Sequence, residues 1–366
     1  MRETSAEEGR TTVADAMDDA PRRRARSRPP GRVTVADVAR AAEVSTASVS
    51  RVLNNHDRVG EALRRRVMDA SERLGYLPDA TARALASDRS RTIGAIVPTL
   101  ENQSFAICVD GLQRRLEAAG YTLLLANSGY DPDKESRAVK ELIGRGVDGL
   151  MLVGALRDPK VYDLLRGKGV PFVNTLTLTD DVRRPCVGFD NRAAARRLAD
   201  YLLDLGHREF GVIAGVTRDN DRAMARLAGV RDALTARGLA LPQERLIERP
   251  YKIGEGQYGL RALLVCQRRP TAVVCGNDVL AFGALIEARA AGISVPEQLS
   301  ITGFDDADFA AHLNPPLTTV RVPLDDIGAR AGDFLVARIE GRAAPVINEV
   351  PSSLIVRGST GVPPAP

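Results

Sequence analysis

The sequence predicts two kinds of fold in one chain: a small all-α module near the N-terminus and a much larger α/β body. Between residues 32 and 77 the apolar residues recur with helical spacing. From Thr92 onward, short apolar runs alternate with amphipathic helical stretches, a pattern typical of doubly wound parallel sheets with helices on both faces. At 366 residues the chain is long enough for two or three domains, and the alternating part is long enough for two lobes.

The small module is expected to hold three helices. Thr34 and Asp37 resemble a capping box at the start of the first helix, with Asp in place of the usual Glu or Gln. Ser45 is placed to cap a second helix, and a third is expected over residues 61–74, ending at Gly75. The inward stripes of these helices are expected to be Val35, Val38 and Ala39, then Val49, Val52 and Leu53, then Leu63, Val67, Ala70 and Leu74.

The body is expected to alternate strands and helices from end to end. The strands are predicted over residues 93–97, 121–126, 149–153, 210–214, 272–275 and 301–304, and the helices over 105–119, 135–145, 191–205, 223–237 and 279–291. We therefore predict four segments: a disordered basic arm (1–31), a helical module (32–77), a linker (78–91) and a two-lobed body (92–366).

Charge is distributed unevenly along the chain. The net charge is +4, but residues 21–91 carry +8, residues 1–20 carry −4, and residues 92–366 are close to neutral. A basic module on a neutral body indicates a polyanionic partner for the module alone. Alternatively, the positive charge of residues 21–91 reflects an arginine-rich, solvated surface without such a partner. The arm either adds attraction to phosphates or has no role.

Several classes of protein are disfavoured. No apolar run is long enough to span a membrane, and the polar N-terminus lacks the apolar core of a secretion signal, so we expect a cytoplasmic protein. The four cysteines are far apart in apolar surroundings and are expected to be reduced core residues rather than disulfides or metal ligands: Cys108, Cys186, Cys266 and Cys275.

No enzyme is expected, and no metal or cofactor. The segment Gly144–Gly149 matches the glycine pattern of a dinucleotide-binding loop, but it follows a predicted helix and precedes a strand, which is the reverse of that loop's setting. The three histidines are isolated from one another.

Residues 33–54 carry the strongest functional signal. Two short helices would cross closely at Ala39, Val44 would fill the corner between them, and the second helix would present Arg51 outward. This arrangement is that of a helix-turn-helix, whose second helix enters the major groove of DNA.

The chain strongly resembles the lactose-repressor (LacI) family of bacterial regulators over residues 33–360. The motifs that carry the resemblance, besides residues 33–54, are Gly75-Tyr-Leu-Pro-Asp79, Ile93-Gly-Ala-Ile-Val-Pro98, Arg226-Leu-Ala-Gly229, Asn277-Asp278, Gly303-Phe-Asp-Asp306 and Pro316-Leu-Thr-Thr319. The resemblance implies a periplasmic-binding-protein-like body, a homodimer on a near-palindromic operator in double-stranded DNA, and a small-molecule effector, expected to be a sugar or sugar derivative. No long heptad segment is present, so a dimer is expected rather than a tetramer.

The resemblance also assigns the DNA contacts. Residues matched to base-reading positions are Thr46, Ala47 and Arg51, and those matched to phosphate contacts are Thr34, Ser45, Ser50 and Asn54. An arginine can pair bidentately with guanine, although Arg51 could equally be a general phosphate contact. Residues 79–87 resemble the family's hinge helix, with Leu85 as the minor-groove wedge or, alternatively, as a contact to the dimer partner.

Two substitutions depart from the family pattern in this half. Asp79 stands where Asn is usual; the acid is unfavourable near phosphates but is a good helix cap. Glu43 stands in place of a common turn glycine. If that turn needs a positive φ, Glu43 costs about 1 kcal/mol there.

Two lobes of this kind bind ligands in the cleft at the carboxyl ends of their strands. By resemblance the effector contacts are Ser104, Phe105, Asn174, Arg226 and Asp305, with Asp278 as a pocket-wall position. Arginine and carboxylate groups suit hydroxyl-rich ligands, although each polar residue could instead form an inter-lobe salt bridge or cap a strand end. Gln103-Ser104 departs from the commoner Pro-Phe.

One alternative function is a sugar-binding transport receptor, whose fold resembles residues 92–360. Such a receptor would need an export signal and would not need the helix-turn-helix. Both observations favour a sequence-specific DNA-binding regulator, expected to be a repressor.

Overall fold

The computed structural model describes residues 33–53, 59–77 and 89–365, and the chain divides into two compact units, residues 1–79 and 80–366. We call the first unit the headpiece and the second the body. The predicted arm (1–31), Asn54 and the predicted hinge helix with Asp79 and Leu85 lie outside the described residues.

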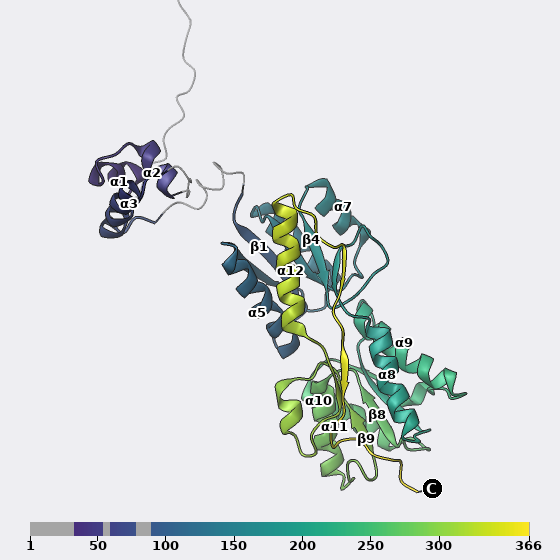
Figure 1. The fold of residues 1–366 in the computed structure, drawn as a ribbon. Helices are drawn as coiled ribbons and strands as arrows, with labels where there is room; N and C mark the ends of the chain where they lie inside the picture. Colours follow the sequence, from purple (N-terminus) through teal and green to yellow (C-terminus); the bar gives the residue numbers. More distant parts are fainter. Residues whose placement is uncertain (1–32, 54–58, 78–88, 366) are drawn as a thin grey trace, which may run out of the picture. The chain divides into compact units, whose positions relative to one another are not determined.

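The described part of the headpiece holds the three expected helices: α1 (Val35–Ala41), α2 (Thr46–Leu53) and α3 (Glu61–Leu74) (Figure 1). The capping box forms as predicted, because Asp37 N–H donates to Thr34 Oγ1 at 3.3 Å and Thr34 N–H donates to the Asp37 carboxylate at 3.0 Å. Ser45 Oγ accepts the N–H of Ser48 at 3.1 Å and so caps α2. Gly75 ends α3 in the left-handed conformation.

A small apolar core joins the three helices, formed by Val38, Ala39, Ala42, Val49, Val52, Val67 and Ala70. Leu74 departs from the predicted stripe and is 36% exposed. The helix α3 is about twice as long as α1 or α2, so these two helices cannot cover its whole length.

The first lobe of the body is a six-stranded parallel sheet of order β11-β5-β4-β3-β1-β2. Its strands are β1 (Thr92–Val97), β2 (Thr122–Asn127), β3 (Gly149–Val153), β4 (Phe172–Thr175), β5 (Cys186–Gly188) and β11 (Ile347–Glu349), and its helices are α5 (Gln103–Ala118), α6 (Pro132–Gly144), α7 (Pro159–Gly167) and α12 (Leu324–Ile339). Alternate residues of β1 face opposite sides: Ile93 packs in the core with α5 and α12, and Ile96 packs with α6 and α7.

The second lobe is a four-stranded parallel sheet of order β7-β6-β8-β9. Its strands are β6 (Phe210–Gly215), β7 (Leu246–Arg249), β8 (Ala272–Cys275) and β9 (Ser300–Thr302); its helices are α8 (Asn191–Asp204), α9 (Asp221–Ala236), α10 (Ile253–Leu264) and α11 (Asp278–Ala290), with short 3-10 turns η1 (Gln243–Arg245) and η2 (Asp308–His312). The predicted fold class, a helical headpiece with a two-lobed body of doubly wound parallel sheets, is confirmed.

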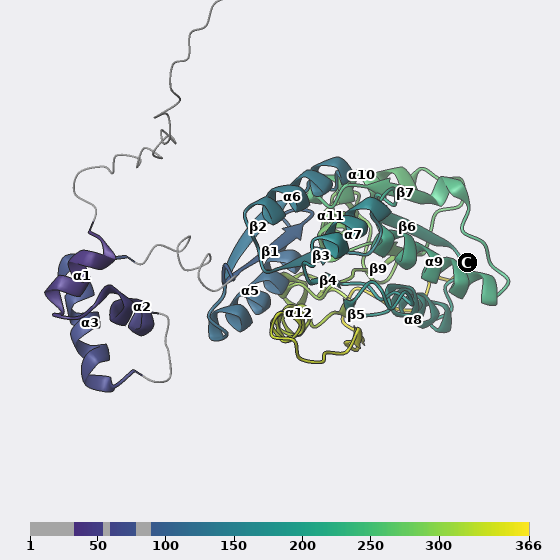
Figure 2. The same ribbon diagram turned by 90° about the horizontal axis from the view of Figure 1, so that it is seen from above.

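The chain passes between the lobes three times. It crosses from β5 to α8, from β10 (Thr319–Arg321) to α12, and from β11 to β12 (Ser353–Ile355). The strands β10 and β12 pair antiparallel, so two of the crossings are hydrogen-bonded to each other. Figure 1 shows the two lobes with chain segments passing between them, and Figure 2 shows the same ribbon from above, with α12 beside α5.

The cysteines are free thiols. Cys108, Cys186 and Cys275 are buried as expected, whereas Cys266, just after α10, is only half-buried. Within the described ranges, no helix has the length and apolar character needed to cross a membrane.

The helices α5 and α12 pack backbone against backbone in the first lobe. A Cβ on Gly328 would collide with the main-chain carbonyl of Cys108, and a Cβ on Gly111 would collide with that of Asp325. Glycine is therefore required at this contact for its lack of a side chain.

We expect Gly328→Ala to destabilise the body by about 1–3 kcal/mol, because the extra methyl group must push two packed helices apart. The measurement is the urea unfolding midpoint of the full chain. Gly254→Ala is the matched control, since Gly254 also lies in a helix but a Cβ there meets open space. Equal midpoints for the two variants would contradict the close contact.

Candidate functional site

The helix α2 presents a polar face. Val49 and Val52 point into the headpiece core, and the exposed residues are those predicted to meet DNA, namely Thr46, Ala47, Ser50 and Arg51. Of the predicted phosphate contacts, Thr34 and Ser45 both serve as helix caps, with Ser45 exposed and Thr34 half-buried. The described DNA-contact candidates therefore cluster around the start and outer face of α2.

The turn between α1 and α2 contains a strained residue. Glu43 has φ +53°, so this turn does need the left-handed conformation that glycine adopts most easily. A non-glycine side chain in this region costs about 1 kcal/mol. The turn nevertheless closes, because Val44 N–H donates to the Ala39 carbonyl at 2.9 Å.

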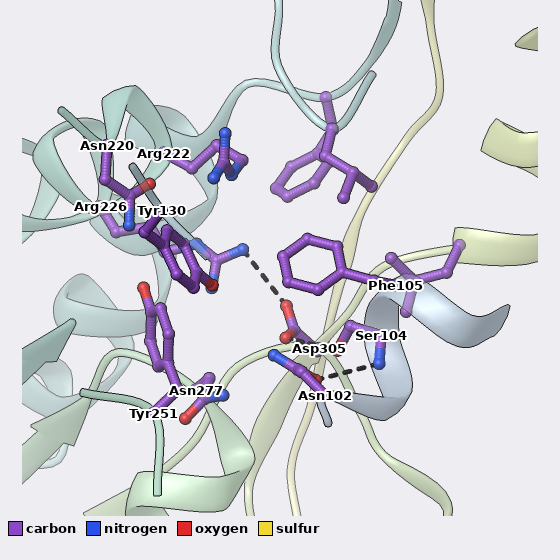
Figure 3. A pocket seen from close by; sticks show the side chains of 13 residues that line it. Asn102, Ser104, Phe105, Tyr130, Asn220, Arg222, Arg226, Tyr251, Asn277 and Asp305 are labelled. Atoms are coloured by element: carbon purple, nitrogen blue, oxygen red, sulfur yellow. Dashed lines mark hydrogen bonds and ion pairs between the residues drawn. The ribbon is translucent and has the colours of Figure 1, made fainter. Parts of the chain in front are cut away.

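The body contains a pocket in the cleft between its lobes, which we call the inner pocket, of about 410 Å³ including its open mouth. It lies at the carboxyl ends of strands from both sheets, where parallel α/β folds bind ligands. Figure 3 shows its lining, which is Asn102, Ser104, Phe105, Tyr130, Leu176, Phe189, Asn220, Arg222, Arg226, Tyr251, Asn277, Asp305 and Leu324.

Arg226 on α9 anchors the second-lobe side of the inner pocket. Its guanidinium donates to Asn191 Oδ1 at 2.9 Å and to the carbonyl of Gly276 at 2.8 Å, and it pairs with Asp305 at 3.2 Å (Figure 3). The guanidinium carbon also lies 3.7 Å from the centroid of the Phe304 ring. Arg226 and Asp305 belong to the same lobe, so their ion pair is not an inter-lobe bridge.

Asp305 links the two lobes. Ser104 at the start of α5 donates its hydroxyl to the other Asp305 oxygen at 2.8 Å. Asp305 itself has φ +103°, and its main-chain N–H donates to the Val320 carbonyl at 2.8 Å. Strain of this kind persists only where the surroundings enforce it, and it concentrates at binding sites.

Three asparagines converge on the inner pocket from three helix N-termini. Asn102, Asn220 and Asn277 cap α5, α9 and α11, each through its side-chain oxygen. A capping oxygen leaves the amide NH₂ as the group that can donate to a ligand. The Asn220 NH₂ already donates one of its hydrogens to the Val216 carbonyl at 3.3 Å, which leaves its second hydrogen for this role. The partial positive charge of three helix N-termini also favours ligand oxygens here.

Two tyrosines from opposite lobes form an aromatic wall. Tyr130 and Tyr251 have ring centroids 6.2 Å apart and lie beside the Arg226–Asp305 pair (Figure 3). Tyr251 fits against the end of β6 because Gly215 has no side chain; a Cβ there would occupy the position of the Tyr251 ring. Burial raises the pKa of the Tyr251 hydroxyl, so it stays protonated at neutral pH.

Four of the six predicted effector residues therefore line the inner pocket, and two lie elsewhere. Asn174 was expected after a strand, but it lies within β4, fully buried, where its oxygen accepts from Arg157 and from the Tyr162 hydroxyl. Leu176, two residues later, lines the pocket instead.

Asp278 is not among the residues that line the inner pocket either. As the first residue of α11 it is 2% exposed and accepts from Thr319 Oγ1 and from the N–H of Ala307, both at 2.6 Å. The neighbouring cap Asn277 takes the pocket position. Burial, with the nearby carboxylates of Asp305 and Asp306, raises the pKa of Asp278 to about 8.

The cap asparagines, the tyrosine pair and Arg222 were not predicted from the sequence as pocket residues. The asparagines carried a usable signal, because each directly precedes a helix that follows a predicted strand. Tyr251 follows β7, a strand that the apolar pattern did not reveal.

Comparison with known proteins agrees with both halves of the chain. Residues 34–79 match the pattern of bacterial regulatory proteins of the lacI family, and residues 199–360 match the periplasmic binding protein-like domain. The HTH-type transcriptional repressor CytR of Escherichia coli K12 is 34% identical over 329 residues, 89% of this chain and 96% of CytR. The chain belongs to the LacI family.

Solved structures of LacI-family proteins share the fold of this regulator. A lac repressor dimer bound to operator and the anti-inducer ONPF has a TM-score of 0.80 at 27% identity, over 90% of this chain and 99% of that one. The regulator CelR in complex with cellobiose has a TM-score of 0.66 at 31% identity, over 90% and 100%. These relatives are transcriptional regulators, not enzymes or transport receptors.

We expect Asp278→Asn to flatten the pH dependence of this LacI-family regulator's stability between about pH 4 and 8. In the folded chain the Asp278 carboxyl has a pKa of about 8 and keeps its proton between pH 4 and 8. In the unfolded chain its pKa is the ordinary 3.8, so the carboxyl has lost its proton over the same range. Stability contributed by Asp278 is therefore present at low pH and falls as the pH rises through this window. The amide of asparagine can keep both contacts, with its oxygen accepting from the N–H of Ala307 and its NH₂ donating to the Thr319 hydroxyl oxygen once that hydroxyl has turned.

The measurement is the urea midpoint at pH 5 and pH 8.5 for wild type, Asp278→Asn and the control Asp163→Asn, which changes an exposed carboxylate on α7. An unchanged difference between the two pH values in Asp278→Asn would contradict the raised pKa.

Proposed function

We propose that this regulator represses transcription by binding operator DNA as a cytoplasmic homodimer, and that a sugar or sugar derivative in the inner pocket changes its operator affinity. The observation that carries the proposal is the inner pocket itself. It brings an arginine, a strained carboxylate, three asparagine amides and two tyrosines from both lobes to one place. The family relation supports a DNA-binding headpiece on the same chain.

The headpiece half of the proposal rests on the exposed face of α2. Arg51 supplies the long donor that can pair with guanine, while Thr46 and Ala47 offer small apolar contacts to base edges. Thr34, Ser45, Ser50 and Asn54 hold phosphates, and Leu85 enters the minor groove at the hinge. The related lac repressor, solved as a dimer bound to operator, supports a dimer here as well.

The effector half rests on the chemistry of the pocket. Asparagine amides donate to hydroxyl oxygens, and Asp305 accepts from hydroxyl hydrogens. The pocket therefore offers partners for a sugar hydroxyl both as an acceptor and as a donor. Tyr130, Tyr251 and Phe105 provide flat apolar surfaces for the carbon face of a sugar ring. The cellobiose complex of CelR supports a sugar as the class of ligand.

Ligand binding would act through the contacts that join the lobes. Asp305 holds Ser104 of the first lobe and Arg226 of the second, so a ligand that pairs with Asp305 changes the relation between lobes. Couplings of this kind are typically about 1–3 kcal/mol.

Arg51→Ala should weaken binding to the selected operator by about 1–3 kcal/mol, since one bidentate base contact is lost. The operator is selected from random duplexes with the wild-type chain, and binding is followed by fluorescence anisotropy at fixed salt. Arg73→Ala, at the end of α3, is the charge-matched control. An equal loss on operator and on random DNA would assign Arg51 to phosphates instead.

Asp305→Asn should abolish the effect of sugar on operator binding while operator affinity without sugar is retained. A charged acceptor for ligand hydroxyls contributes about 1.5–3 kcal/mol, and the amide replaces it with a weaker acceptor. A screen of neutral sugars against the operator complex identifies the ligand, and titration of the variant measures the loss. Asp163→Asn is the control, and a full sugar response in Asp305→Asn would refute the role of Asp305.

A further inference from the structure

The cleft continues beyond the inner pocket into a second cavity, which we call the outer hollow, of about 620 Å³ including its mouth. It lies beside the ends of the first-lobe strands and faces the start of α9. Tyr130 and Arg222 line both the inner pocket and the outer hollow, so the two cavities share a wall.

The shared wall is held in place by a contact between the lobes. Arg222 pairs with Asp221 at 2.9 Å, and the other Asp221 oxygen accepts the N–H of Ala155 from the first lobe at 2.7 Å. Gly154 makes this approach possible: its φ is +75°, and a Cβ there would collide with the Arg222 guanidinium. The wall is therefore a built feature of both lobes.

The floor of the outer hollow is a buried ion pair. The Arg157 side chain is 3% exposed and donates to Glu135 Oε1, to the Tyr162 hydroxyl and to two main-chain carbonyls. Its donors are thus committed within the protein. Among the described residues, Glu135 Oε2 has no partner and lines the hollow.

Further acceptors stand at the rim. Asp131 and Asp158 cap α6 and α7 through Oδ1 alone, and in the described part of the chain their Oδ2 atoms bond to nothing. With Asp219 and Asp221 the hollow holds five carboxylates against two arginines. A phosphate or carboxylate on a ligand would be repelled here, whereas hydroxyl groups can donate to the unpartnered oxygens.

The remaining wall is apolar and open. Leu156 is 50% exposed and Tyr130 is 37% exposed, and Pro98 and Pro132 lie in the same lining. Flat apolar surfaces beside carboxylate acceptors suit the two faces of a sugar ring, one of C–H groups and one of hydroxyls.

We propose that the outer hollow is a second sugar subsite, which takes the second unit of an uncharged disaccharide or glycoside whose first unit occupies the inner pocket. The inference rests on the proposed function for the inner pocket. It adds that the effector extends past Tyr130 and Arg222 and carries no anionic group on its second unit.

The test is isothermal titration calorimetry of the full chain with matched neutral sugars: glucose with cellobiose and maltose, and galactose with lactose. We expect at least one disaccharide to bind tenfold or more tightly than its monosaccharide. Asp158→Asn and Leu156→Ala should each lower that disaccharide's affinity at least threefold and leave the monosaccharide's unchanged. Asparagine also caps helices, so Asp158→Asn keeps the start of α7 intact.

Asp163→Asn, on α7 but outside the hollow, is the control, and unfolding midpoints verify that the variants fold. The subsite is overturned, with the proposed function intact, if a monosaccharide binds as tightly as its disaccharides or if the variants weaken both equally. If no sugar binds while operator binding persists, the sugar effector and the subsite fall together.

Discussion

The guanidinium of Arg226 is the interaction on which the body's site depends. One side chain on α9 reaches Asn191 at the first lobe crossing, the carbonyl of Gly276 after β8, and Asp305 after β9. Three segments far apart in the sequence are thereby fixed around a single planar group.

The position of Asp305 follows from that anchor. Its backbone is held in a left-handed conformation, and its two oxygens face in different directions, one toward Arg226 and one toward Ser104. Behind it, Asp278 shares the same buried region. Burial, with the nearby carboxylates of Asp305 and Asp306, raises the pKa of Asp278 to about 8, so the Asp278 carboxyl is largely protonated at neutral pH. A further buried negative charge beside these two groups is thereby avoided.

The sequence predicts the headpiece well, because caps and stripes are local. The capping box at Thr34 and the end of α3 at Gly75 both lie where the pattern placed them. In the body, the strands Gly149–Val153 and Ala272–Cys275 were also predicted with their observed bounds, since buried parallel strands are continuous apolar runs.

The pocket was harder to predict because its residues depend on register. Asn174 lies within β4, and Leu176 directly follows the strand. Which of the two reaches the carboxyl edge of the sheet depends on the register in which β4 pairs with β3. Tyr251 meets Tyr130 through packing of two lobes, which no local pattern in either segment encodes.

The three crossings between the lobes limit how the body can move. A single tether would allow the lobes to twist freely, but β10 and β12 are hydrogen-bonded side by side, and the segment from β5 to α8 runs as a third link. Such a connection restricts twisting of one lobe against the other more than it restricts bending. The chain enters the first lobe at Thr92, at the end of β1 opposite the cleft. If the first lobe rotates as a rigid body about the crossings, a change in cleft width also displaces this far end of the lobe.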